Sequence, residues 1–299
     1  MLINEAAGAP LPDESISWAL VNRIVTDLRR QPQNQSERVS QALLGEAVRI
    51  LEEREGWARV QTERDGGLGW LHTPALWRCR QTDVEAYQHA CTALVPAELL
   101  PTYLRLTPIV PERGGMAGID EAGKLPFGVA LAVVEQREMW AAIRLPDGAQ
   151  WWASNIFLPL ANRPRPDASG IAFTLGLIRR FIGVPYLLGG RTPFGFDGAG
   201  LAQTFWGFMG VAIPREASQQ FQAGLPIEEA PQPGNLVFFG EADPEGSHPA
   251  SQVAISLGGD DLLHANPATW SVACHSLNAG SPNYFPWLCD HLLGVRRFT

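Results

Sequence analysis

The sequence contains no long uninterrupted hydrophobic run. No segment approaches the roughly 20 apolar residues that a helix needs to cross a bilayer. The first 18 residues also lack a basic region followed by an apolar stretch, which is the pattern of a secretory leader. Both absences argue against a membrane protein and favour a cytoplasmic location.

Positive charge is also scarce. The chain has 23 Lys and Arg residues against 31 Asp and Glu residues, a formal net charge of -8 and a pI of about 5.3. Such a chain is not drawn to phosphate backbones or to anionic lipid. We therefore expect neither a nucleic-acid partner nor binding to a membrane.

Cysteine is sparse, and its spacing does not suggest a metal site. No two of the four cysteines are separated by the two to four residues typical of metal ligands: Cys79, Cys91, Cys274 and Cys289. We expect free thiols in a reducing compartment, with no metal and no cofactor.

The remaining composition is that of a globular protein of two or three domains. Hydrophobic residues make up 45% of the 299 residues and charged residues 18%, so the chain can build a core. Ten tryptophans and 24 prolines are unusually many, which favours numerous short strands and turns.

The first 80 residues predict a small β-barrel. Hydrophobic and polar residues alternate over 47–51 and 57–61, with a Glu55-Gly56 turn between them. The pattern resembles a bacterial SH3 domain through Gly45, Gly56, Trp57, Gly69 and Trp70. A weaker copy follows, with strands expected over 127–134, 139–145 and 151–153 and a Pro-Asp-Gly turn at 146–148. We predict two SH3-like domains, 1–80 and 81–162, with a short helix near 82–93.

A proline-punctuated polar stretch over 162–167 predicts a domain linker. After it, Asp167 can cap a helix over 171–181, and a second helix is expected over 201–209. Strands are expected over 235–240, 252–258, 261–265 and 271–277. Helices followed by an antiparallel sheet predict an α+β domain over 163–299.

The segment Pro185 to Phe221 contains the loop Asp197-Gly198-Ala199-Gly200 and resembles the NlpC-type cell-wall cysteine peptidases, which are papain-like. Their loop runs Asp-Cys-Ser-Gly, so the resemblance puts Gly198 at the nucleophile position and Ala199 after it. A papain-type mechanism needs a thiolate at a helix start, with an imidazole as base.

The base of this family begins a His-Val-Gly-Ile-Tyr-Leu-Gly strand, and the matching run here starts at Gln252, which cannot accept a proton near neutrality. The third triad position matches His264, for which a packing or hydrogen-bonding role is the favoured interpretation. The expected catalytic set is therefore degenerate at Gly198 and Gln252.

Other residues match the binding parts of the family. The resemblance implies ligand contacts at Asp197, Ala199, Arg191, Arg215, Glu216 and His264. In members with SH3 domains, the acidic residue that matches Glu216 helps to hold the free amine of a cell-wall peptide. An equally weighted alternative is that the loop glycines serve geometry alone.

Members with this architecture hydrolyse the bond between γ-D-glutamate and a diamino acid in murein peptides. We predict an inactive homologue, not an enzyme, that binds such peptides without cleaving them. One alternative is an interaction module with a vestigial groove and a protein partner for its SH3-like domains. Another is an active hydrolase with rewired catalytic residues.

Overall fold

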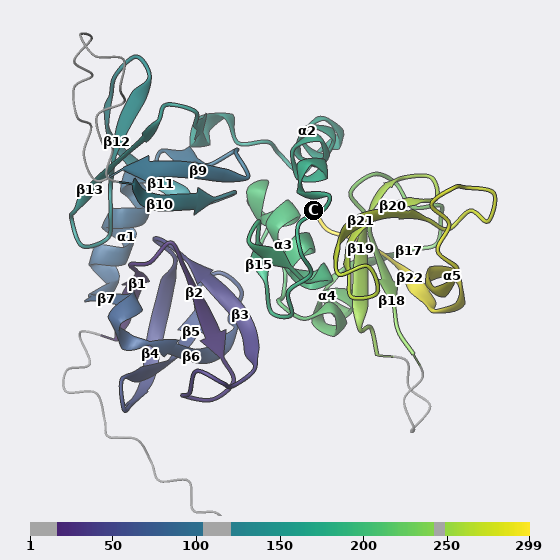
Figure 1. Cartoon of the computed structure of the whole chain (residues 1–299), viewed down its shortest axis with the longest axis horizontal. Coiled ribbons are helices and arrows are strands. Elements are labelled where there is room, and N and C mark those ends of the chain that lie inside the picture. Colours follow the sequence, from purple (N-terminus) through teal and green to yellow (C-terminus); the bar gives the residue numbers. More distant parts are fainter. Residues whose placement is uncertain (1–16, 104–120, 242–248) are drawn as a thin grey trace, which may run out of the picture. The chain divides into compact units, whose positions relative to one another are not determined.

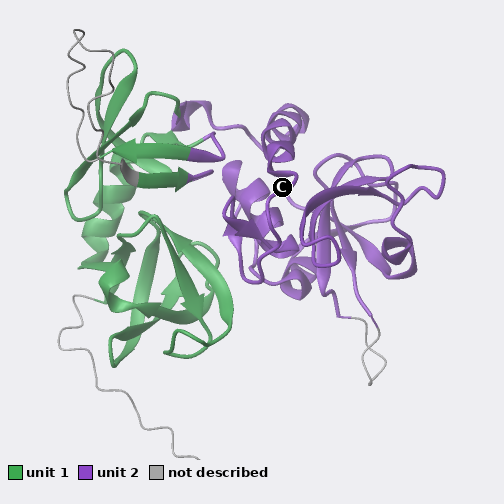
Figure 2. Cartoon of the chain, viewed as in Figure 1, with its two compact units in different colours: residues 1–95, 100–125, 129–157 green, residues 96–99, 126–128, 158–299 purple. Residues whose placement is uncertain are grey.

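A computed structural model describes residues 17–103, 121–241 and 249–299. Most of the segment used for the leader argument lies outside the described residues. The chain divides into two compact units, coloured separately in Figure 2. Unit 1 comprises residues 1–95, 100–125 and 129–157, and unit 2 comprises residues 96–99, 126–128 and 158–299.

The first sheet of unit 1 has seven strands in the order β3-β2-β6-β5-β4-β1-β7 (Figure 1). They are β1 (Trp18–Val21), β2 (Val25–Arg29), β3 (Arg38–Leu43), β4 (Ala47–Arg54), β5 (Trp57–Thr62), β6 (Leu68–His72) and β7 (Leu76–Cys79). Arg54 pairs with Trp57, so Glu55 and Gly56 form the whole turn between β4 and β5. Both have positive φ, 48° and 84°, as a tight hairpin turn requires.

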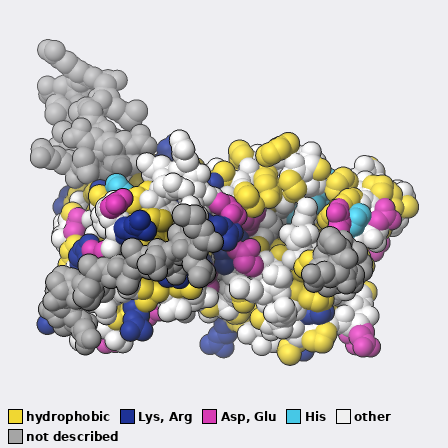
Figure 3. Space-filling view, turned by 90° about the horizontal axis from the view of Figure 1, so that it is seen from below, with side chains coloured by type: hydrophobic (Ala, Val, Ile, Leu, Met, Phe, Trp, Pro, Cys, Tyr) yellow, Lys and Arg dark blue, Asp and Glu magenta, His cyan; other side chains and the backbone are white. Residues whose placement is uncertain are grey.

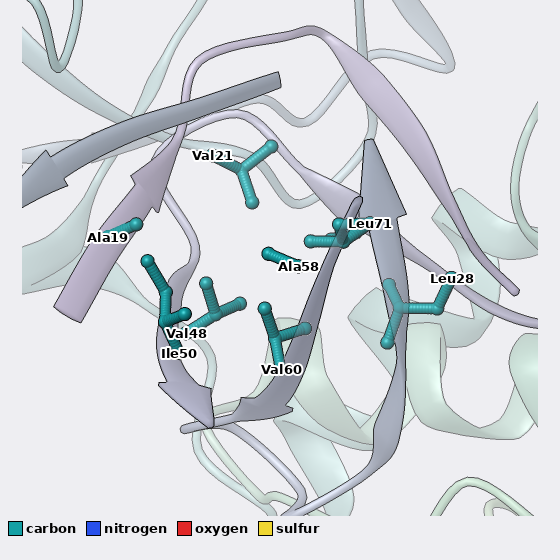
Figure 4. Close-up of a cluster of buried hydrophobic side chains, with 9 residues drawn as sticks. Ala19, Val21, Leu28, Val48, Ile50, Ala58, Val60 and Leu71 are labelled. Atoms are coloured by element: carbon teal, nitrogen blue, oxygen red, sulfur yellow. The ribbon is translucent and has the colours of Figure 1, made fainter. Parts of the chain in front are cut away.

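The interior of this sheet is filled by small aliphatic side chains that meet between the strands (Figure 4). In β5 they alternate with exposed residues: Ala58 and Val60 are buried, and Arg59 and Gln61 are exposed. Such alternation fixes the register, because a slip of one residue would turn every apolar side chain to solvent.

A second seven-stranded sheet has the same strand order, β10-β9-β13-β12-β11-β8-β14. Its strands are β8 (Ala93–Leu94), β9 (Leu99–Tyr103), β10 (Glu121–Pro126), β11 (Ala130–Gln136), β12 (Trp140–Arg144), β13 (Gln150–Ser154) and β14 (Leu158–Pro159). The strand expected from residue 127 begins only at Ala130, because Gly128 turns the chain with φ +80°. Helix α1 (Gln81–Ala90) packs Val84 and Tyr87 into a core shared with Leu20 of β1 and Ala132 of β11.

Unit 2 is α+β. Its sheet has six strands in the order β17-β22-β18-β19-β20-β21, and every described pairing is antiparallel. The strands are β17 (Leu225–Ile227), β18 (Leu236–Phe239), β19 (Gln252–Gly258), β20 (Asp261–Asn266), β21 (Ser271–Ser276) and β22 (Leu292–Arg297), with a separate pair β15 (Arg191–Thr192) and β16 (Gly195–Phe196). The helices are α2 (Ala168–Ile178), α3 (Gly198–Phe208), α4 (Ala217–Ala223) and α5 (Pro286–Asp290), and short 3-10 turns cover Thr73–Ala75, Leu160–Asn162 and Arg179–Phe181.

Helix α3 packs against β19 and β20 of this sheet (Figure 1). Nearly all of its residues are buried, including Phe205, Trp206 and Phe208. At its other end, the Arg163 guanidinium donates to the carbonyls of Gly207 and Phe208, so a cation lies at the helix C-terminus. The helix is therefore fixed along its whole length.

None of the helices in the described ranges is long and apolar enough to cross a membrane. On the face in Figure 3, basic, acidic and hydrophobic side chains are interspersed.

Candidate active site

The candidate site is built around the first turn of α3. Asp197 is its N-cap, with extended φ -97° and ψ 172°, and its Oδ1 accepts a hydrogen bond of 2.7 Å from the Gly200 amide. Gly200 is required by packing, because a Cβ atom there would overlap the Gly190 carbonyl oxygen. The sequence Asp-Gly-Ala-Gly thus starts the helix and lets it approach the preceding loop closely.

Asp197 also forms a buried ion pair with Arg215. The guanidinium donates from Nη1 to Oδ1 at 3.0 Å and from Nη2 to Oδ2 at 2.6 Å, a bidentate geometry. Oδ2 also accepts from the Gly189 amide at 2.8 Å. With four donors on one carboxylate, Asp197 holds the loop and the helix together and has little capacity left for a ligand.

The segment before α4 is tied to α3 by two buried glutamines. Gln220 Nε2 donates to the carbonyls of Ala199 and Pro214 at 3.1 and 2.8 Å. Gln203 Nε2 donates to the Ile213 carbonyl at 2.9 Å. Glu216, the N-cap position of α4, is exposed and follows Arg215 directly, so its backbone lies next to the residue that pairs with the N-cap of α3.

Arg191 lies in β15 and is only 4% exposed. Its carbonyl accepts a hydrogen bond of 2.9 Å from Thr204 Oγ1 of α3. The structure therefore brings Arg191, Asp197, Ala199, Arg215 and Glu216 into one neighbourhood, although Arg191 and Arg215 are too buried to form an open surface.

Gly198 faces the beginning of β19. It is partly exposed, and a Cβ atom at this position would lie 2.7 Å from the Val253 carbonyl oxygen and 3.6 Å from Val253 Cγ1. Gln252 precedes Val253 and pairs with Phe239 of β18. The two positions that resemble nucleophile and base are thus close together, and neither supplies a thiol or an imidazole.

His264 is fully buried in β20, and its Nε2 lies 2.8 Å from Nδ1 of His275 in β21. Burial, and to a lesser extent His275, lowers the pKa of His264 to about 3, and burial lowers the pKa of His275. Both imidazoles are therefore neutral at pH 7. Sequence reasoning missed this partnership, because it depends on which residues of β20 and β21 lie side by side.

Cys274, next to His275, is not an activated thiol. Burial raises its pKa, and the Asn283 amide lies at the limit of hydrogen bonding, with Nδ2 4.0 Å from Sγ. A nucleophilic thiol requires a lowered pKa.

Tyr186 is a second residue that sequence reasoning missed. It is half-buried, and burial, followed by the negative charge of Asp197, raises the pKa of its hydroxyl. Its ring contacts Trp270, with 6.1 Å between centroids and 80° between planes. Tyr186 lies within the segment that resembles the family, but the sequence did not predict its contact with Trp270, because the two residues are more than 80 positions apart.

The described parts of the chain contain no group of three or more His, Cys, Asp or Glu side chains that could hold a metal ion.

Two family models match the chain: the bacterial dipeptidyl-peptidase Sh3 domain over residues 28–76 and the NlpC/P60 family over residues 183–287. A γ-D-glutamyl-L-lysine dipeptidyl-peptidase of Bacillus subtilis is 38% identical over 232 residues, covering 76% of this chain and 71% of the relative. A protein of the same name from Bacillus cereus is 23% identical, covering 94% of this chain and 81% of the relative.

The fold is shared with a crystal structure of an NlpC/P60 family protein from Bacillus cereus. Its TM-score is 0.75 at 21% identity, over 94% of this chain and 99% of that one. The α+β, papain-like domain preceded by an SH3-like domain is therefore confirmed.

The prediction that the chain is not an enzyme is wrong. Its relatives are named as dipeptidyl-peptidases, and this favours enzyme function. The prediction relied mainly on Gly198 and Gln252, and the side chains at two positions do not decide what other groups in a site can do. With both family models matched and a 38% identical relative covering most of its length, the chain belongs to the NlpC/P60 family.

Proposed function

We propose that this protein binds γ-D-glutamyl peptides of the cell wall at the first turn of α3 and acts on them as a hydrolase. The observation that carries the proposal is the place of the exposed residue Glu216, in a segment that the Arg215–Asp197 pair and the Gln220 hydrogen bonds hold against the start of α3. A carboxylate in this place suits the free amine of a short peptide.

The first turn of α3 supplies the complementary group. The leading amides of a helix have no acceptor within the helix, and the helix dipole adds partial positive charge there. Those of Gly198 and Ala199 suit a carboxylate or a developing oxyanion of the bound peptide. Because Gly198 offers no side chain, hydrolysis here uses water: its oxygen joins the carbonyl carbon, the C–N bond breaks, and a proton goes to the leaving amine.

This proposal assigns different roles to the binding residues. Glu216 contacts the ligand. Asp197 and Arg215 satisfy the charge of each other and therefore do not contact the ligand; they position the segment that carries Glu216. Arg191, Ala199 and His264 support the site through packing and backbone contacts.

The test uses L-Ala-γ-D-Glu-L-Lys, with titration calorimetry for binding and mass spectrometry for release of L-Lys. Saturable binding with release of L-Lys is expected. Binding without release would refute the hydrolase and leave peptide recognition, whereas absence of both would refute the proposed function as a whole.

Glu216→Gln gives a sharper test of the amine contact. We expect the variant to weaken binding about 2- to 10-fold, as an exposed ion pair would. N-acetylation of the peptide removes the partner charge and should weaken binding as much. The two changes together should cost little more than either alone; additive losses would show that Glu216 and the amine do not meet.

We further propose that the sheet β8–β14 is a second SH3-like domain, because it repeats the strand order of the first. The domain ranges 1–80, 81–162 and 163–299 remain a proposal, and so do a protein partner for the SH3-like domains and a cytoplasmic location.

A further inference from the structure

Trp270 has an unusual conformation. It lies in the turn between β20 and β21, with φ +54° and 70% of its surface exposed. Bulky residues rarely adopt this left-handed backbone, which favours Gly or Asn. A strained backbone that also exposes a large aromatic ring is a reason to look for a function.

The turn is attached to the candidate site. The Tyr186 amide donates to the Trp270 carbonyl at 2.8 Å, and Pro185 forms a bridge with Ser271. Tyr186 in turn bridges to Phe196, the residue before Asp197. The Tyr186 and Trp270 rings therefore form an aromatic rim beside the start of α3.

This rim contains no charge of its own. Neither 182–190 nor 265–274, the two segments that form it, includes a Lys, Arg, Asp or Glu residue. Leu188, also on the first segment, is 57% exposed. The rim is thus a surface for an aliphatic chain, and an aromatic face attracts a cation that reaches it.

We propose that the aromatic rim of Trp270 and Tyr186 receives the side chain of a lysine-type residue that follows γ-D-glutamate. The inference depends on the proposed function. The four-carbon stem packs on the rings, and the ammonium lies against the face of an aromatic ring. A diaminopimelate side chain carries an additional carboxylate, which finds no cation in these two segments and loses water without compensation.

Calorimetry with three peptides tests this specificity: L-Ala-γ-D-Glu-L-Lys, L-Ala-γ-D-Glu-meso-diaminopimelate, and the dipeptide L-Ala-γ-D-Glu. The unmodified protein should bind the lysine peptide most tightly. Trp270→Asn keeps the left-handed backbone and removes the ring, so it should lower the affinity for the lysine peptide about 3- to 10-fold. The dipeptide, which does not reach the rim, should bind as before.

Trp270→Phe retains an aromatic face, so its affinity for the lysine peptide should lie between those of the unmodified protein and Trp270→Asn. Leu225→Ala is the matched control, because Leu225 is 53% exposed on β17, at the opposite edge of the sheet from β21. It should change none of the three affinities.

The failure of this inference differs from failure of the proposed function. Unchanged affinities in Trp270→Asn, or equal binding of the lysine and diaminopimelate peptides by the unmodified protein, overturn the role of the rim only. Absence of binding of all three peptides overturns both.

Discussion

The Asp197–Arg215 pair is the contact on which the geometry of the site depends most. Both side chains are buried, at 12% and 7% exposure, and they share two hydrogen bonds. Removing one partner of a buried pair leaves an uncompensated charge, which costs about 3–5 kcal/mol of unfolding free energy. Arg215→Met should therefore destabilise unit 2 by about that amount.

Asp197→Asn isolates the charge from the helix cap. Asparagine can still cap α3, so the ~1 kcal/mol of a capping bond is kept, while the Arg215 guanidinium loses its counter-charge. This variant should also lose about 3–5 kcal/mol. The double variant leaves no buried charge, so its loss should be smaller than the sum of the two by 2 kcal/mol or more, roughly.

These free-energy differences are measured by urea titration, with hydrogen exchange of the α3 amides as the probe of unfolding in unit 2. Arg180→Met is the matched control in the same unit, because Arg180 Nε lies 3.3 Å from Glu98 Oε1 but the two side chains are 55% and 42% exposed. It should cost under about 1 kcal/mol. Equal losses in Arg215→Met and Arg180→Met, or an additive double variant, would refute the reasoning.

Three further predictions follow from the site and its surroundings. Gly198→Ala gains helix propensity but brings a Cβ atom within 2.7 Å of the Val253 carbonyl oxygen. The free energy of unfolding, measured with urea, should therefore fall by about 1–3 kcal/mol. A stabilised variant would contradict the close approach. Because the pKa of His264 drops to about 3 on folding, its contribution to stability is present above the unfolded pKa and is lost as the pH falls from about 6.5 towards 3, by up to ~1.4 kcal/mol per unit. His264→Asn should flatten this part of the stability curve, and an unchanged slope would show that the imidazole is not buried as a neutral group. Trp270→Asn should leave the melting temperature unchanged or raise it by a few degrees, because asparagine adopts the left-handed backbone at a cost lower by about 1 kcal/mol; a clear fall would show that the ring stabilises the fold.

Local signals allowed much of the fold to be predicted from the sequence. Asp167 caps α2 through the Gly170 amide, and Glu55-Gly56 turns the first sheet, both as expected. Residues 252–258 form β19 as expected, because an apolar run between polar turns needs little tertiary context. These features depend on neighbours in the sequence.

The elements that were missed depend on distant parts of the chain. Strand β17 contains Pro226 and is only three residues long, and it exists because β22, near the C-terminus, pairs with it. Proline is tolerated there because β17 is an edge strand. In the same way, the partnership of His264 with His275 follows from the register of β20 and β21, which the residue pattern alone does not give.

The error about enzyme function has a related cause. A motif comparison assumes that only the side chain at position 198 differs from the family. In the structure the neighbouring strand packs closely on this glycine, because a Cβ atom there would lie 2.7 Å from the Val253 carbonyl oxygen. Restoring a cysteine would therefore require β19 to move as well. The backbone at the start of α3 is therefore adapted to glycine, and a side chain at position 198 does not fit the present arrangement of α3 and β19.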